Sequence, residues 1–97
     1  MLTNSSFLVT GGTGSFGKTF IKHLLKNDVR SITCFSRDED KQHALKISLS
    51  DERIKFIIGD IRDSYAVDLA LKDIDFVFHG AALKLSLIHI SEPTRPY

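Results

Sequence analysis

A short apolar run leads directly into a cluster of glycines in the stretch Phe7-Leu8-Val9-Thr10-Gly11-Gly12-Thr13-Gly14-Ser15-Phe16-Gly17. The apolar residues 7–10 are typical of a buried strand, and the glycines that follow indicate a turn. From Ser15 to Asn27, apolar side chains recur at helical spacing with lysines between them, which predicts an amphipathic helix. The stretch therefore predicts a strand, a tight turn and a helix in direct succession.

The same alternation continues along the rest of the chain. Apolar or β-branched runs predict strands at 31–35, 54–58 and 74–79, and helix-compatible segments occupy 38–48 and 65–72. The order β-α-β-α-β-α-β with short connections indicates a parallel sheet with helices on its faces. The predicted fold class is α/β, as the N-terminal half of a doubly wound parallel sheet.

Length and composition exclude several classes of protein. The 97 residues allow one domain or part of one. Thirteen Lys and Arg against twelve Asp and Glu give a net charge of +1, which excludes a strongly basic nucleic-acid module.

The single cysteine, Cys34, fits a reducing compartment, and its place in a buried strand favours core packing over nucleophilic chemistry. No apolar run approaches the roughly 18 residues of a membrane span. We expect a cytoplasmic protein with no membrane and no nucleic-acid partner.

Residues 85–97 differ in character from the rest of the chain. They have no clear period and contain both prolines of the sequence, Pro93 and Pro96. One interpretation is a frayed terminal segment or an edge strand. The other is that Leu85 to Arg95 are translated from a transposon-end adapter used in DNA library preparation, which eleven consecutive codons would match. We therefore expect a partial dinucleotide-binding domain at 1–84 and a non-native tail at 85–97.

The spacing of Gly11, Gly14 and Gly17 is a variant of the dinucleotide-binding fingerprint. The first glycine lets the chain turn sharply, the second lets the backbone approach a pyrophosphate, and the third lets the helix pack close to the sheet. The phosphates would then meet free N–H groups at the start of the helix. The alternative is a tight strand–helix turn that binds no ligand.

The residues at the end of the second predicted strand indicate whether the cofactor is NADP or NAD. An acidic residue there would accept from a ribose hydroxyl, whereas an arginine would accommodate a 2′-phosphate. Ser36 and Arg37 stand at this place, and Lys41 adds a charge one helical turn later. Asp38 and Glu39 could instead face a ribose hydroxyl or pair with Arg37. The balance favours NADP, with an exposed charged helix start as the alternative.

The third and fourth predicted strands also end in candidate binding residues. Asp60 is placed to accept from an adenine amino group and Ile61 to pack on the ring, although a turn aspartate is an alternative for Asp60. Ala81 and Ala82 are small enough to let a nicotinamide ribose approach. His79 ends the fourth predicted strand and is interpreted as a partly buried strand-end histidine, because the sequence spacing does not indicate an acid–base role. We expect no metal site.

At these positions the chain resembles the extended short-chain dehydrogenases/reductases. More narrowly it is similar to the soluble inverting UDP-N-acetylglucosamine 4,6-dehydratases of bacterial polysaccharide biosynthesis. The similar stretches are residues 8–18, 35–42, 56–63, 75–79 and 81–84. One departure is Gly80, where the family usually carries alanine, and we expect a slightly wider turn there.

The resemblance implies a Rossmann fold that holds NADP and an oxidation at C4 of a UDP-sugar. Loss of water across C5 and C6 and return of the hydride to C6 would then give a 4-keto-6-deoxy sugar, inverted at C5. The cofactor-binding residues it implies are Gly11, Thr13, Gly14, Ser15, Phe16, Gly17, Ser36, Arg37, Lys41, Asp60, Ile61, Ala81, Ala82 and, with an undefined role, Lys84.

The family's acid–base residues lie downstream of residue 84, so no catalytic residue is named here and the 97 residues alone are expected to be inactive. The longer parent enzyme is expected to form homo-oligomers. Two alternatives stay open. One is a nucleotide-sugar 4-epimerase of the same superfamily, and the other is a non-catalytic NADP-binding sensor.

Overall fold

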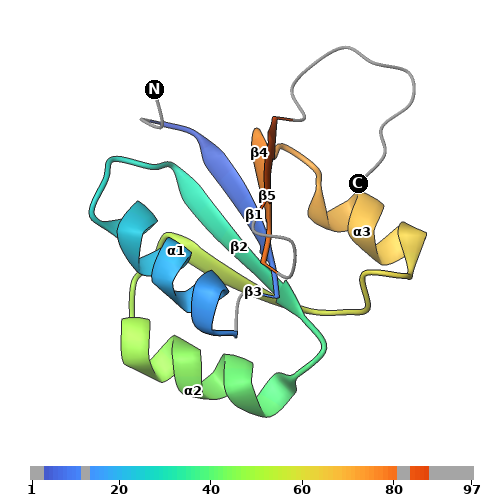
Figure 1. Cartoon of the computed structure of the whole chain (residues 1–97), viewed down its shortest axis with the longest axis horizontal. Coiled ribbons are helices and arrows are strands. Elements are labelled where there is room, and N and C mark those ends of the chain that lie inside the picture. Colours follow the sequence, from blue (N-terminus) through green and yellow to red (C-terminus); the bar gives the residue numbers. More distant parts are fainter. Residues whose placement is uncertain (1–3, 12–13, 81–83, 88–97) are drawn as a thin grey trace.

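The computed structural model describes residues 4–11, 14–80 and 84–87, except for the side chains of Lys84 and Ser86. One five-stranded sheet has the order β3-β2-β1-β4-β5 (Figure 1). Its strands are β1 Ser6–Thr10, β2 Ser31–Ser36, β3 Ile54–Ile58, β4 Phe76–His79 and β5 Lys84–Leu87. The first four are parallel, and β5 runs antiparallel to β4.

Three helices connect the parallel strands: α1 Ser15–Leu25, α2 Glu39–Leu49 and α3 Ser64–Ala70. Alternate residues of β1 face opposite sides of the sheet. Phe7 and Val9 pack in one cluster with residues of α1 and α2, whereas Leu8 packs in a second cluster with Val67 and Ala70 of α3. The helices thus cover both faces, and the strand order changes direction between β1 and β4. This confirms the N-terminal half of a doubly wound Rossmann fold.

The predicted elements match the observed ones except near their ends. The first helix ends at Leu25 rather than at Asn27, and the fourth strand begins at Phe76 rather than at Ile74. The apolar periodicity of the sequence does not predict β5. For residues 85–97 an edge strand belonged to one of the two interpretations, and a translated adapter was the other. This strand pairs Phe78 with Leu85, within the segment that also resembles an adapter.

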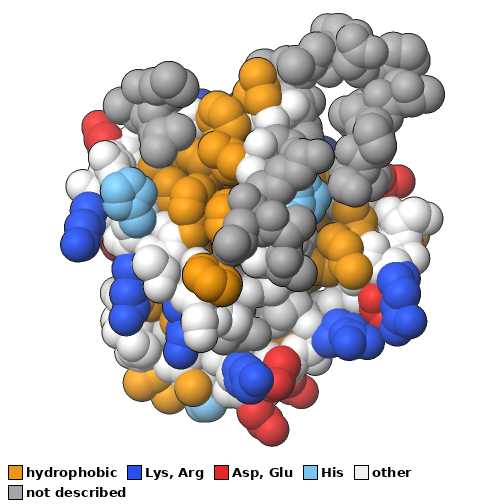
Figure 2. Space-filling model, viewed as in Figure 1, with side chains coloured by type: hydrophobic (Ala, Val, Ile, Leu, Met, Phe, Trp, Pro, Cys, Tyr) orange, Lys and Arg blue, Asp and Glu red, His pale blue; other side chains and the backbone are white. Residues whose placement is uncertain are grey.

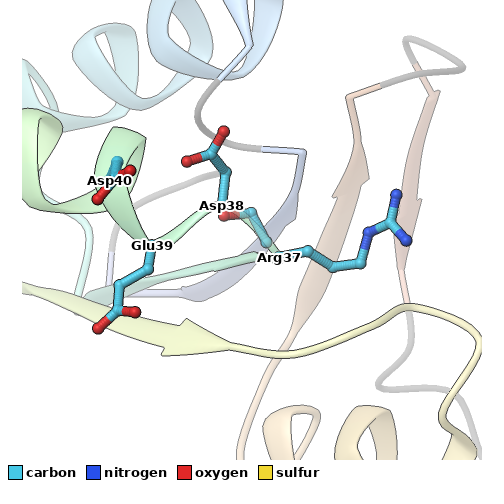
Figure 3. A pocket seen from close by; sticks show the side chains of 5 residues that line it. Arg37, Asp38, Glu39 and Asp40 are labelled. Atoms are coloured by element: carbon cyan, nitrogen blue, oxygen red, sulfur yellow. The ribbon is translucent and has the colours of Figure 1, made fainter.

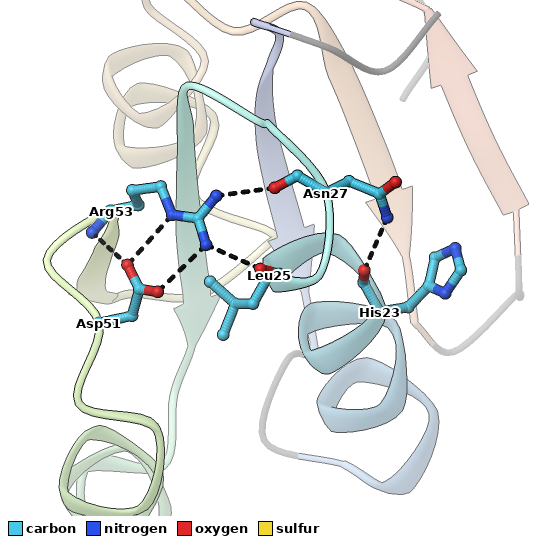
Figure 4. A network of polar contacts seen from close by, with 5 residues as sticks. All are labelled: His23, Leu25, Asn27, Asp51 and Arg53. Atoms are coloured by element: carbon cyan, nitrogen blue, oxygen red, sulfur yellow. Dashed lines mark hydrogen bonds and ion pairs between the residues drawn. The ribbon is translucent and has the colours of Figure 1, made fainter.

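A network around Arg53 explains why α1 stops where it does (Figure 4). The Arg53 guanidinium donates to the backbone carbonyls of Leu25 and Asn27, each at 2.8 Å. Asp51 holds the guanidinium from the other side through an ion pair of 3.1 Å. Side-chain and backbone hydrogen bonds from Arg53 lower the pKa of Asp51. The end of α1 is therefore tied to the start of β3.

Cys34 lies fully buried in the cluster beneath α1 and α2, as the sequence predicts. Burial raises the pKa of its thiol to about 11 from 9.0. Since the thiolate is the reactive form, the ionised fraction at pH 8 falls from about one in ten to about one in a thousand. We expect iodoacetamide at pH 8 to alkylate the folded chain at least about 100-fold more slowly than the urea-unfolded chain. Mass spectrometry measures the rate, and equal rates would show that this core does not form.

No helix in the described part of the chain is long and apolar enough to cross a membrane. Within the same ranges, no group of three His, Cys, Asp or Glu side chains is arranged to hold a metal ion.

Candidate functional site

The carboxyl ends of the four parallel strands meet at one edge of the sheet and surround a cavity of about 430 Å³. The cavity is lined by Thr10, Gly11, Phe35, Ser36, Arg37, Gly59, Ile61 and His79. Doubly wound sheets bind their ligands at this edge, beside the point where the strand order changes.

Two glycines shape the cavity. Gly11 has φ of 66°, a left-handed conformation that glycine adopts without a steric cost, and its N–H donates to the Phe35 carbonyl at 3.1 Å. The turn continues with a hydrogen bond of 3.0 Å from the Gly14 N–H to the Gly11 carbonyl. A Cβ on Gly59 would lie 2.8 Å from the Phe35 ring. At Gly11 and Gly59 the cavity wall is therefore formed by backbone alone, and a side chain at Gly59 would collide with the Phe35 ring.

The turn at Gly80 lies closer to β1 than we expected. Gly80 is buried, and a Cβ there would lie 2.6 Å from the Thr10 carbonyl oxygen. The expected widening of this turn is therefore wrong, because the missing side chain allows a closer approach of the two strand ends.

Gln42 fixes the end of β2, although sequence reasoning assigned it no role in the site. Its side chain is only 3% exposed. The amide Nε2 donates to the Ser36 hydroxyl and to the Ile57 carbonyl, both at 2.9 Å. Ser36 is thus held at the cavity by α2. Only the tertiary structure shows this, since a single glutamine in a charged helix carries no signal of burial.

Asp60 lies at the mouth of the cavity between two arginines. It accepts from Arg62 at 2.8 Å and forms an ion pair of 3.7 Å with Arg37. The Arg62 side chain and backbone N–H, followed by the Arg37 charge, hold the pKa of Asp60 well below its usual range. Asp60 also accepts from the Arg62 N–H within its own turn, so the turn-aspartate interpretation describes its local structure.

Arg37 and Asp38 point in opposite directions from the end of β2 (Figure 3). Asp38 is the N-cap of α2 and accepts from the Lys41 backbone N–H at 2.9 Å. Its carboxylate also lies 3.9 Å from the Lys41 ammonium. The sequence left Asp38 and Glu39 open as partners for Arg37, but the structure pairs Arg37 with Asp60 and gives Asp38 a capping role.

Three of the remaining predicted residues, Ser15, Phe16 and Gly17, begin α1. Ser15 and Phe16 are exposed, Phe16 by 61%, whereas Gly17 is buried in the helix as its proposed packing role requires. Ile61 lines the cavity and is half exposed. Thr13, Ala81 and Ala82 lie outside the described residues, and Lys84 is described only as the first residue of β5.

Lys41 lies outside the cavity, in a separate groove of about 510 Å³ between α1 and α2. The groove is lined by Gly14, Ser15, Lys18, Lys22, Lys41, Ala44, Leu45 and Ser48. Sequence reasoning treated the α1 lysines only as an exposed face. Their shared groove arises from the packing of two helices that are separate in sequence.

The chain is similar to one protein family over most of its length. The family described as polysaccharide biosynthesis protein matches residues 7–92. A UDP-glucose 4-epimerase of Rickettsia bellii is 49% identical over 88 residues, which cover 87% of this chain and 26% of the relative. A UDP-glucose 4-epimerase of Rickettsia prowazekii is 44% identical with the same coverage. The chain thus spans about a quarter of the length of these relatives.

Solved structures contain the same fold. Pen from Bacillus thuringiensis has a TM-score of 0.77 at 35% identity, covering 80% of this chain and 24% of that chain. The enzyme WbmF from Bordetella bronchiseptica, solved in complex with NAD+ and UDP, has a TM-score of 0.64 at 26% identity. The matched region covers 80% of this chain and 23% of the WbmF chain.

Proposed function

The chain belongs to the polysaccharide biosynthesis protein family, and on this premise we propose that residues 1–84 are the NADP-binding part of a nucleotide-sugar 4,6-dehydratase. One observation carries the proposal. The left-handed turn at Gly11 brings the start of α1 beside an open cavity at the carboxyl ends of four parallel strands. Such a turn and helix start bind pyrophosphates, and the adjoining cavity has room for an adenosine.

The residues of this chain fit a dinucleotide in three zones. Backbone groups of the turn and of Ser15 and Phe16 would bind the phosphates, with Gly17 allowing α1 to pack close. Ser36, Arg37 and Lys41 would surround the adenosine ribose. Ile61 would pack on the adenine, and Asp60 would hold Arg37 at the cavity mouth while offering an acceptor to the adenine amino group. Ala81, Ala82 and Lys84 complete the proposed set on the nicotinamide side.

The charges at the end of β2 favour NADP over NAD. Arg37 and Lys41 provide cations within five residues of the strand end, and Asp38, the nearest acid, is used as a helix cap. The relative WbmF was solved with NAD+, so both cofactors belong in every binding test.

The cofactor, when bound, would accept a hydride from C4 of a UDP-sugar, and this chemistry serves two reactions. The motif resemblance favours 4,6-dehydration of UDP-N-acetylglucosamine. The Rickettsia relatives favour 4-epimerisation, because they are UDP-glucose 4-epimerases by name. WbmF was solved with UDP, which supports a UDP-sugar substrate for either reaction. In both, residues 1–84 would bind the cofactor and exclude water from its adenosine half.

The test begins with the source DNA beyond the codon for Lys84. We propose that residues 85–97 are translated adapter, so the native reading frame should continue differently and encode a longer enzyme. That enzyme is then incubated with UDP-N-acetylglucosamine or UDP-glucose, and the products are analysed by mass spectrometry and NMR. A dehydratase product is lighter by one water, whereas an epimerase product keeps the substrate mass.

Each outcome decides a separate point. A product lighter by one water supports the dehydratase, and an unchanged mass with an inverted C4 supports the epimerase. Cofactor binding without either product favours the sensor. If genomic DNA encodes Leu85 to Tyr97 and then a stop codon, the adapter interpretation and the enzymatic proposal are both wrong.

A further inference from the structure

Three charged side chains meet at the mouth of the cavity. Arg37 comes from the end of β2, whereas Asp60 and Arg62 come from the loop between β3 and α3. Figure 2 shows acidic and basic side chains gathered on the side of the molecule where that loop runs in Figure 1. Arg37 lines the cavity and Arg62 does not. Any influence of Arg62 on a ligand in the cavity would therefore pass through Asp60.

The two arginines share the Asp60 carboxylate unequally. The Arg62 guanidinium donates from Nη2 to Oδ2 at 2.8 Å and from Nε to Oδ1 at 3.1 Å, so it engages both oxygens. The nearest Arg37 nitrogen lies 3.7 Å from Oδ2, beyond hydrogen-bond distance. Within the described part of the chain, the Arg37 guanidinium makes no hydrogen bond. Because forked contacts of this kind are the strong ones, Asp60 is held mainly by Arg62.

This arrangement leaves one positive charge at the cavity mouth, since two guanidinium groups surround one carboxylate. With a neutral side chain at position 62, Asp60 and Arg37 would cancel each other. The carboxylate would then attract Arg37 alone, and a closer pair would turn the Arg37 donors away from the cavity. The charge on Arg62 thus controls how many Arg37 donors stay free for a ligand.

We propose that Arg62 is a positioning residue for the cofactor: by compensating Asp60, it keeps the Arg37 guanidinium free to bind a phosphate on the adenosine ribose. This inference rests on the proposed dinucleotide site and adds a residue to which sequence reasoning assigned no role. Arg62 itself touches no cofactor atom. It strengthens the preference for NADP over NAD, and Asp60 transmits the effect.

The test compares two half-cofactors that differ only in the ribose phosphate, 2′,5′-ADP and 5′-AMP. Their dissociation constants are measured by isothermal titration calorimetry on the 97-residue chain and on the complete gene product. The ratio of the two constants gives the preference for the phosphate. Arg62→Gln should lower this preference about three- to fivefold, the size of effect that exposed ion pairs produce. The loss should shrink as salt is raised, because exposed charges are screened.

Two control variants separate charge from shape and from net charge. Arg62→Lys keeps a cation beside Asp60 and should retain most of the preference. Lys72→Gln removes an exposed cation that does not line the cavity, so it should leave the preference unchanged. Urea unfolding should give the same midpoint for all three variants, because exposed ion pairs contribute little to stability.

A double-mutant cycle with Asp60→Asn distinguishes positioning from a direct contact with the ligand. Asp60→Asn removes the carboxylate that would capture Arg37. Whatever this substitution itself does to binding, Arg62→Gln should then cause no further loss of preference. A direct contact between Arg62 and the phosphate would instead cause the same loss with either residue at position 60.

The outcomes separate this inference from the proposed function. If both nucleotides bind and Arg62→Gln leaves the preference unchanged, or lowers it equally in the Asp60→Asn background, Arg62 does not position Arg37, although the dinucleotide site stands. If wild type binds both nucleotides equally well, Arg37 meets no ribose phosphate and the inference is wrong. If neither nucleotide binds to protein with native circular dichroism, the inference and the proposed function are both wrong.

Discussion

Replacing Gln42 by glutamate should leave the chain largely unfolded at neutral pH. The substitution keeps the shape of the side chain but turns its buried donor into an acceptor, 2.9 Å from the Ile57 carbonyl. The Ser36 hydroxyl can rotate to donate, whereas the carbonyl cannot. An unpaired charge at a position 3% exposed costs about 3–5 kcal/mol, a large part of the stability of a small domain.

The destabilisation by Gln42→Glu should depend on pH in one direction. Burial would raise the pKa of the new carboxyl in the folded state above the ordinary value of about 4.3. The folded state then retains its proton to a higher pH, so the variant loses stability as pH rises above about 4. Urea titrations followed by circular dichroism at pH 4.5 and 7.5 measure this loss.

Gln42→Met is the matched control for that result. It removes the same hydrogen bonds without introducing a charge, so it should cost about 1–2 kcal/mol at both pH values. Equal stability of the Gln42→Glu and Gln42→Met variants at pH 7.5 would show that the side chain at position 42 reaches water, and that Gln42 does not fix the end of β2.

The strands and the glycine turn could be predicted from the sequence because their signals are local. The apolar runs at 7–10 and 31–35 are short and bounded by turn residues, and a glycine at position 11 is the residue that a left-handed turn favours. Helix ends were less predictable. The end of α1 depends on Arg53, which is remote in sequence and donates to two carbonyls at that end.

The candidate site was predicted only in part, because only some of its residues carry a local sequence signal. Residues at strand ends, such as Ser36 and Ile61, do line the cavity. The pairing of Arg37 with Asp60 and the burial of Gln42 were not predictable, since both join separate β-α units. The groove between α1 and α2 was not predicted, because helical periodicity places Lys22 on the polar face of its helix but does not say which helix lies opposite it.

Ser36→Asp should reverse the preference for NADP, provided that the 2′ position lies at the end of β2. A carboxylate there would repel a phosphate and accept from a ribose hydroxyl, as in NAD-binding proteins of this fold. Like charges brought together at a binding site cost several kcal/mol, so the dissociation constant for NADP should rise by about 100-fold or more. NAD should bind as well as before or more tightly.

The local structure makes this substitution a clean test of charge. Ser36 accepts from Gln42 Nε2, and the aspartate oxygen can accept the same hydrogen bond, so the anchor on α2 survives. Ser36→Asn is the control, since it has the same shape as the aspartate and keeps an acceptor but carries no charge. Calorimetric titration with NADP and NAD should therefore separate the two variants by the charge alone. If the Ser36→Asp and Ser36→Asn variants bind NADP equally, the 2′-phosphate does not approach the end of β2.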